Sequence, residues 1–266
     1  MAATSQKAFE ECFLEIARPY LEKYSSMPIC LAGGCALNII LNTRIKNEFK
    51  RDVFIGPSPN DCGIASGLML NFLKPEKPID LTYKGVPLLD RDSLSIYLNE
   101  SPKPVKKIIY ENEDIENYDD TILISINKVV DDLEKGLIIG LIQNNSEHGP
   151  RALGNRSIIC NPMISDMKEI LNKKVKNREW YRPFAPVVRL EDVNKYFEFN
   201  EESRWMSFCP KVKKEWREKL LAVTHVDNTA RVQTVTKEQN KFLYNLLTKF
   251  EEKTGTGRFA QYIVQC

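Results

Sequence analysis

The chain has 266 residues, a formal net charge of +2, 42% hydrophobic residues and 28% charged residues. This length can supply hydrophobic cores for two domains, and so small a net charge argues against general nucleic-acid binding. No apolar run approaches the length of about 18 residues that a membrane-spanning helix needs. The amino-terminal sequence lacks a secretory signal pattern and the seven cysteines contain no CxxC pair, so we expect reduced thiols and a cytoplasmic location.

Residues 1–74 alternate between helical and strand-like patterns. The expected elements are a helix at residues 6–24, a strand at 27–32, a helix at 35–42, a strand at 53–55 and a helix at 64–72. Such alternation predicts an α/β fold.

Two turns in this part are candidate ligand sites. Gly33-Gly34 lies between a strand and a helix start, where glycine permits close approach of a ligand to backbone N–H groups, although many such turns are purely structural. Asp61 follows the second strand in a turn, where its carboxylate is either a metal ligand or a helix cap.

Residues 75–118 read as a connector between two domains. Prolines are spread through polar sequence, with one short helix expected at residues 90–99. We therefore expect a first domain at residues 1–74 and a second at 119–266.

The second domain begins as another α/β unit. Its expected elements are a strand at 121–126, a helix at 129–133, strands at 136–142 and 158–160, a helix after Ser165, a helix at 192–197, a strand at 206–209, extended segments at 221–227 and 231–235, and a helix after a capping box of Thr236 and Gln239. That last helix should bury a face that contains Phe242, Leu243, Leu246, Leu247 and Phe250.

Basic residues concentrate between residues 147 and 189. The nine cations of this stretch are Arg151, Arg156, Lys168, Lys173, Lys174, Lys176, Arg178, Arg182 and Arg189. A solvated basic surface is the ordinary explanation of such a run. Interrupting glycines, prolines and aromatics that look buried favour an anion pocket instead, because Arg binds phosphate oxygens in a bidentate manner.

A second group of polar residues follows at residues 225–233. If this segment is extended, His225 and Asp227 face the same side, and Arg231 and Gln233 share their parity. A histidine alone here would be a satisfied core residue. Its polar neighbours make His225 a functional candidate.

Five sequence blocks together resemble the nodulation and antibiotic-tailoring O-carbamoyltransferases. They are LAGGCALN (31–38), FIGPSPNDCGIASG (54–67), EHGPRALGNRSI (147–158), NKKVKNREWYRPFAPVV (172–188) and HVDNTARVQTV (225–235). The resemblance implies part of an ASKHA-like (actin/Hsp70-like) carbamoyl-transfer module at residues 1–74, followed by a YrdC-like α/β domain at 119–266. The latter makes carbamoyladenylate from carbamoyl phosphate and ATP, and the carbamoyl group then passes to a hydroxyl of a small acceptor.

The resemblance also assigns roles to residues. Those expected to line the carbamoyl phosphate and ATP pocket are Arg151, Lys176, Arg182 and Arg231, with His225 as a further catalytic candidate. Gly33 and Gly34 resemble nucleotide-contacting glycines, and Arg156, Ser157 and Arg178 are additional candidates from the same blocks. Asp61 resembles a metal ligand. The expected cofactors are ATP with Mg²⁺, and Fe²⁺ or another divalent metal in the full-length family.

The matched blocks correspond to the carboxy-terminal portion of that family. No histidine precedes His148, so Asp61 lacks the family's metal-binding histidines, and the sequence after Gly255 departs from the family pattern. We therefore expect no tightly bound iron or zinc in the isolated chain. We also expect an amino-terminal partner subunit or self-association, through under-covered apolar faces around Leu31 and Leu68.

Three functions remain open at this point. The first is an O-carbamoyltransferase or its carboxy-terminal part, and the second is a catalytically inactive ATP- or carbamoyl-phosphate-binding module that acts with a partner chain. The third, an RNA-binding strip at residues 168–189, is disfavoured because the strip lacks interleaved exposed aromatics. We expect neither a nucleic-acid nor a membrane partner.

Overall fold

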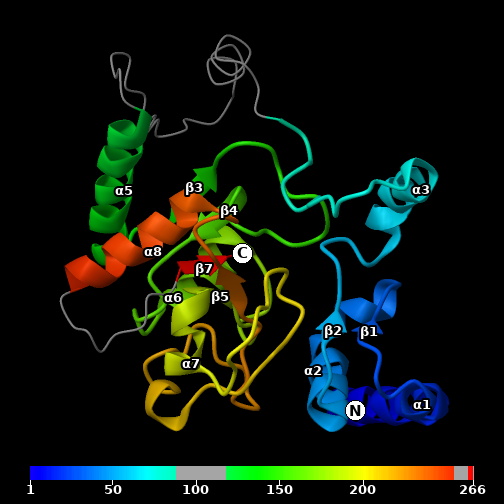
Figure 1. The fold of residues 1–266 in the computed structure, drawn as a ribbon. Coiled ribbons are helices and arrows are strands. Elements are labelled where there is room, and N and C mark those ends of the chain that lie inside the picture. Colours follow the sequence, from blue (N-terminus) through cyan, green and yellow to red (C-terminus); the bar gives the residue numbers. More distant parts are fainter. Residues whose placement is uncertain (88–117, 255–262, 266) are drawn as a thin grey trace.

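The computed structural model describes residues 1–87, 118–254 and 263–265 (Figure 1). Within these ranges the protein is a mixed α/β structure with small sheets, as the sequence predicts. Among the same residues, no helix combines the length and the apolar character that crossing a bilayer requires. The helix expected at residues 90–99 lies outside the described residues.

The amino-terminal part packs two helices against a parallel strand pair. Its elements are α1 (Ala2–Lys23), β1 (Ile29–Cys30), the 3₁₀ helix η1 (Gly34–Leu37), α2 (Ile39–Phe49), β2 (Val53–Phe54), the 3₁₀ helix η2 (Asp61–Gly63) and α3 (Ile64–Leu73). β1 and β2 pair with Ile29 opposite Val53. Leu14, Leu41 and Ile45 form the buried centre between α1, α2 and this strand pair.

Helix α3 stands apart from this core (Figure 1) and buries none of its residues. Leu68 is 67% exposed and Phe72 is 86% exposed, which confirms the expected uncovered apolar face at Leu68. The prediction of an uncovered face at Leu31 is not confirmed, because the Leu31 side chain is partly buried and packs against two hydrophobic clusters.

The carboxy-terminal part contains two small sheets between helices. Its helices are α5 (Tyr118–Glu134), α6 (Met167–Ile170), the π-helix η3 (Leu171–Val175), the 3₁₀ helix η4 (Leu190–Asp192), α7 (Val193–Tyr196), the 3₁₀ helix η5 (Lys214–Trp216) and α8 (Lys241–Thr254). β3 (Ile139–Ile142) pairs antiparallel with β4 (Arg156–Ile159). In the second sheet, β5 (Ala185–Arg189) lies between parallel β6 (Gln233–Val235) and antiparallel β7 (Ile263–Gln265).

The predicted face of α8 is confirmed. Leu243, Leu246, Leu247 and Phe250 are buried in one cluster with residues of α5, and the two helices lie against each other in Figure 1. The capping box also forms, since Thr236 and Gln239 exchange backbone-to-side-chain hydrogen bonds. It closes the turn before the helix, while Asn240 accepts the Leu243 N–H at 3.0 Å.

Three strand predictions are wrong. Residues 121–126 belong to α5, where Ile126, Val129, Val130 and Leu133 recur at helical spacing and pack against α8. A short apolar run does not distinguish a strand from a buried helix, and here the tertiary packing decides. Residues 206–209 and 221–227 form no named strand in the described chain. The left-handed backbone of Met206 at φ 56° and of Asn228 at φ 64° suits turns rather than extended chain.

Several polar contacts join the two parts of the chain. The amide of Asn42, in α2, donates to the carbonyls of Ala36 at 2.8 Å and Ser207 at 3.0 Å. The hydroxyl oxygen of Thr43 accepts the Cys209 N–H at 2.8 Å. The contacts with Ser207 and Cys209 bond α2 to the segment between β5 and β6, so the first sequence blocks lie beside the later ones.

Candidate functional site

The 147–156 loop lies where the two parts of the chain meet. Its backbone touches the turn at residues 56–59, because the Ser58 hydroxyl donates to the His148 carbonyl at 2.9 Å. Gly149 has φ +127°, and a Cβ there would lie 2.3 Å from the Pro57 carbonyl oxygen, so only glycine fits without displacement. Arg151 reaches back from this loop toward the Leu37 carbonyl, with Nη2 3.4 Å from the oxygen.

Arg231 is the centre of a cationic cluster. Burial, and then the positive charges of Arg151 and Arg178, lower the pKa of Arg231 to about 10. Burial also lowers the pKa of Arg151. Among the residues that the structure describes, the buried Nε of Arg231 has no hydrogen-bond partner. Three guanidinium groups that repel one another, with a buried donor unused, form a setting that an anion would relieve.

Arg178 is held toward this cluster by a buried asparagine. Its Nε donates to the Asn172 side-chain oxygen at 2.6 Å, and its guanidinium lies 4.3 Å from the centre of the Phe184 ring. The Asn172 amide nitrogen donates to the carbonyls of Trp180 at 3.1 Å and Arg182 at 3.0 Å. One side chain therefore holds the whole 178–182 segment. The π-helix η3, which contains Asn172, is a feature frequent at functional sites.

His225 lies next to the cluster, in a turn and not on a strand. Burial is the main cause that lowers its pKa; the charges of Arg231 and Lys168 act in the same direction and Asp227 opposes them. Its Nδ1 lies 2.9 Å from the Thr229 hydroxyl oxygen, and that hydroxyl donates to Asp227 at 2.7 Å. The Thr229 oxygen therefore accepts from Nδ1–H, and in the neutral ring Nε2 is the acceptor nitrogen.

Two of the four predicted pocket cations lie outside this cluster's buried part. Lys176 is exposed. The Arg182 side chain is 54% exposed and its Nε lies 2.8 Å from a carboxylate oxygen of Glu179. Arg151 and Arg231 are thus brought together, whereas Lys176 and Arg182 are at the surface of the segment that Asn172 anchors.

Arg156 and Ser157 make structural contacts. The Arg156 guanidinium donates to the carbonyls of Gln143 at 2.8 Å and Asn155 at 2.9 Å. The buried Ser157 hydroxyl accepts the Gly154 N–H at 3.0 Å. Both residues hold the base of the 147–156 loop on β4.

The glycine turn and Asp61 are exposed. Gly33 has φ 92° and its N–H donates to the Pro59 carbonyl at 2.6 Å, so it joins its own turn to the 56–59 turn. Asp61 begins η2, and neither η2 nor α3 has a side-chain cap hydrogen bond. In the described part of the chain, no group of three or more His, Cys, Asp or Glu could hold a metal ion. The described residues around Asp61 therefore do not fit a transition-metal site.

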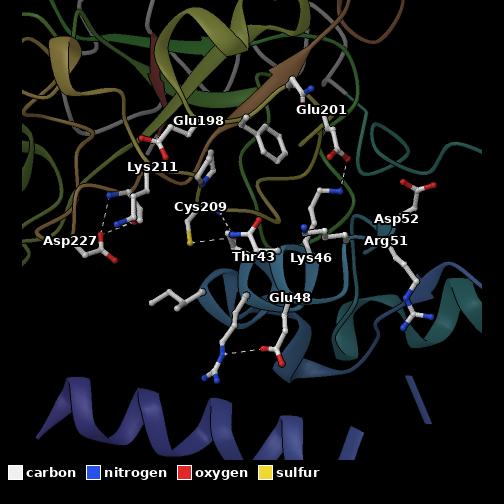
Figure 2. A pocket seen from close by; sticks show the side chains of 18 residues that line it. Thr43, Lys46, Glu48, Arg51, Asp52, Glu198, Glu201, Cys209, Lys211 and Asp227 are labelled. Carbon is white, nitrogen blue, oxygen red and sulfur yellow. Dashed lines mark hydrogen bonds and ion pairs between the residues drawn. The ribbon is translucent and has the colours of Figure 1, made fainter. Parts of the chain in front are cut away.

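A wide cleft of about 920 Å³ lies elsewhere, between α2 and the segment at residues 198–211. Figure 2 shows charged residues of both signs on its walls. They are largely compensated: Lys46 pairs with Glu201, and Arg44 contacts Glu48 at 3.7 Å. None of the predicted site residues lines this cleft. The cluster around Arg231, with its unused buried Nε, is therefore the better candidate for chemistry on an anion.

Sequence reasoning missed the roles of Glu147 and Asn172. Both lie inside the quoted blocks, but only their contacts show that they organise the loops that carry Arg151 and Arg178. It also misjudged two aromatics. Trp180 is 71% exposed and Tyr181 is 53% exposed, in an edge-to-face pair with ring centroids 5.9 Å apart. The stated absence of exposed aromatics from the basic strip is therefore wrong.

Comparison with known proteins agrees with this arrangement of blocks. The family model described as "Carbamoyltransferase N-terminus" matches residues 1–70, and "Carbamoyltransferase C-terminus" matches residues 130–260. The chain belongs to the carbamoyltransferase family. This membership supports an enzyme by resemblance.

Three relatives align with almost the whole of this chain. The chain is 34% identical over 268 residues to nodulation protein NolNO of Sinorhizobium fredii. The alignment covers 96% of this chain and 37% of the relative. It is also 34% identical over 260 residues to 3'-hydroxymethylcephem-O-carbamoyltransferase of Streptomyces clavuligerus. That alignment covers 96% of this chain and 45% of the relative. The uncharacterized protein sll1178 of Synechocystis is 33% identical over 288 residues, with 97% and 45% covered. The chain therefore spans less than half the length of these relatives.

Proposed function

We propose that this chain supplies the carbamoyl-activating part of an O-carbamoyltransferase. Its YrdC-like portion would bind carbamoyl phosphate and ATP with Mg²⁺ at the cluster of Arg151, Arg178 and Arg231. The product, carbamoyladenylate, would donate its carbamoyl group to a hydroxyl of a small acceptor through the ASKHA-like portion. The observation that carries this proposal is the buried Nε of Arg231, which has no partner in the described chain. The charges of Arg151 and Arg178 also repel this guanidinium.

The chemistry needs fixed cations more than a covalent nucleophile. Water cleaves carbamoyl phosphate to carbamate and phosphate; a carbamate oxygen then attacks the α-phosphorus of ATP, and pyrophosphate leaves. Negative charge remains on phosphate oxygens throughout, and preorganised guanidinium donors stabilise it. In this proposal His225, with Nε2 as acceptor, would hold a proton beside Arg231. Arg182 and Lys176 would meet the outer phosphates after Arg182 leaves Glu179.

The exposed aromatic pair supports a nucleotide as one ligand. Trp180 follows Arg178 closely on the segment anchored by Asn172, so a base stacked on Trp180 or Tyr181 would carry its phosphates toward the cationic residues. Stacking of a base on an aromatic side chain contributes about 1–3 kcal/mol. The same pair leaves single-stranded RNA as a ligand to be tested. A simple salt titration separates the two, because RNA affinity falls steeply with salt.

A partner is also part of the proposal. The exposed apolar face of α3, with Leu68 and Phe72, would be covered by the remainder of the family's sequence, whether it is covalently joined or supplied by another chain. A second copy of this chain is the alternative. Size-exclusion chromatography with light scattering distinguishes a monomer from a dimer, and co-purification with the amino-terminal half of a relative tests the first option.

The decisive experiment is pyrophosphate release. Purified protein should release pyrophosphate from ATP only when carbamoyl phosphate is present, and Arg231→Met should abolish this release. Lys237→Met, which removes an exposed cation on a turn, is the matched control. If ATP and carbamoyl phosphate raise the melting temperature but no pyrophosphate forms, the chain is an inactive binding module. If neither ligand changes the melting temperature, the proposed pocket is wrong.

A further inference from the structure

We propose that Glu147 is a positioning residue that holds Arg151 in the cationic cluster. The proposal rests on the proposed function, because it concerns how the same anion pocket is built. No role was assigned to Glu147 from the sequence. Its importance lies in a set of backbone contacts that only the folded loop displays.

A single carboxylate oxygen of Glu147 closes the loop. Oε1 accepts the N–H groups of Leu153 at 2.7 Å, Asn155 at 2.8 Å and Arg156 at 3.1 Å. Hydrogen bonds to an ionised acceptor are roughly twice as strong as neutral ones. The side chain therefore fixes the far end of the loop to its beginning, with residues 148–152 projecting between the two.

The projecting residues are seated on the amino-terminal part of the chain. The N–H of His148 donates to the Thr82 carbonyl at 2.8 Å, its carbonyl accepts from Ser58, and Gly149 lies against Pro57. Arg151 leaves the loop immediately after this contact, with Nη2 directed to Leu37. Its position is thus set by Glu147 on one side and by the 56–59 turn on the other.

The rest of the loop cannot easily take over this task. The Leu153 carbonyl is already occupied by the Tyr83 hydroxyl at 2.9 Å and the Gln233 amide at 3.1 Å. Gly154 has φ +112°, so the chain turns sharply between the N–H groups that Glu147 binds. If Glu147 is neutralised, these N–H groups keep only a weaker acceptor, and the segment that carries Arg151 gains freedom.

Glu147→Gln tests this, because it keeps the size of the side chain and removes its charge. Glu252→Gln, an exposed carboxylate of α8 paired with Lys249, is the matched control. The first readout is hydrogen exchange at Leu153, Asn155 and Arg156, which should quicken in Glu147→Gln alone. The second is stabilisation by inorganic phosphate, whose apparent affinity should fall about tenfold in Glu147→Gln.

A double variant separates positioning from general destabilisation. Arg151→Ala should weaken the phosphate response, and adding Glu147→Gln to it should weaken the response no further, since Glu147 acts through Arg151. Additive losses, or an unchanged affinity in Glu147→Gln, would overturn the proposal. Glu147→Asp, which keeps the charge on a shorter side chain, serves if Glu147→Gln does not fold. If phosphate does not stabilise the wild-type protein, the proposed function is refuted. If amide exchange is unchanged in Glu147→Gln, the role of Glu147 in holding the loop is refuted.

Discussion

The hydroxyl of Ser58 donates to the carbonyl oxygen of His148 at 2.9 Å, across 90 positions of sequence. The contact makes one structural unit of two loops that belong to separate sequence blocks. It brings the turn at residues 56–59 of the amino-terminal part against the loop that presents Arg151. Displacement of either loop would therefore break this hydrogen bond.

The first prediction concerns the closeness of these loops. Gly149→Ala should destabilise the protein by about 2–4 kcal/mol, because it adds strain at positive φ and a clash with the Pro57 carbonyl. Urea denaturation measures this. Gly67→Ala in α3 is the control: nothing lies within 4 Å of its added Cβ, so a gain of about 0.5–1 kcal/mol is expected. Equal stability of Gly149→Ala and wild type would show that the loops separate in solution.

The second prediction concerns the protonation of His225. Burial and the neighbouring cations lower its folded-state pKa, so the unfolded chain takes up this proton first as the pH falls. The free energy of unfolding should therefore decrease from the ordinary histidine pKa of about 6.5 down to the folded pKa, and be constant above that window. His225→Gln should remove this contribution.

The pKa of His225 should also depend on whether an anion is bound at the cationic cluster. Phosphate beside Arg231 offsets positive charge and should raise the pKa of His225, which NMR titration with and without phosphate would detect. A His225 titration that is insensitive to saturating phosphate would place the anion elsewhere.

The third prediction tests the aromatic pair. Trp180→Ala should weaken ATP binding by about 1–3 kcal/mol, because it removes the stacking surface, and should leave inorganic phosphate binding unchanged. Quenching of intrinsic fluorescence by ATP should be lost in this variant. Trp216→Phe, at a tryptophan that packs on Tyr196, should retain the quenching. Equal weakening of ATP and phosphate binding by Trp180→Ala would mean that the loop itself, and not a stacked base, was disturbed.

The fourth prediction concerns the Glu179–Arg182 ion pair. If ATP recruits Arg182, this pair must break first, so Glu179→Gln should raise the affinity for ATP a few-fold, as expected for an exposed pair. Arg182→Ala should lower the affinity, and the double variant should match Arg182→Ala. Calorimetry with ATP would measure all three. A lower affinity in Glu179→Gln would show that the carboxylate supports the site and does not compete with it.

Local features and family membership could be predicted from the amino-acid sequence. The face of α8, the capping box of Thr236 and Gln239 and the order of motif blocks follow from spacing along the chain, which reports neighbours on one helix or turn. The local surplus of basic residues made Arg151 and Arg178 candidate anion ligands, and the family resemblance added Arg231. The resemblance placed Lys176 and Arg182 ahead of Arg178, because sequence does not distinguish buried from exposed cations in similar surroundings.

Which cations come together, and which residues hold them, depends on long-range contacts in the fold. Arg151 and Arg231 come together because a glycine-dependent contact with Pro57 and the carboxylate of Glu147 shape one loop, and packing around Ala230 and Val232 places the other. Residues 121–126 belong to a helix for the same kind of reason: α5 packs against α8 through Ile126, Val129 and Leu133. Burial and long-range hydrogen bonds depend on what lies opposite in space, and that information is not contained in the period of a pattern.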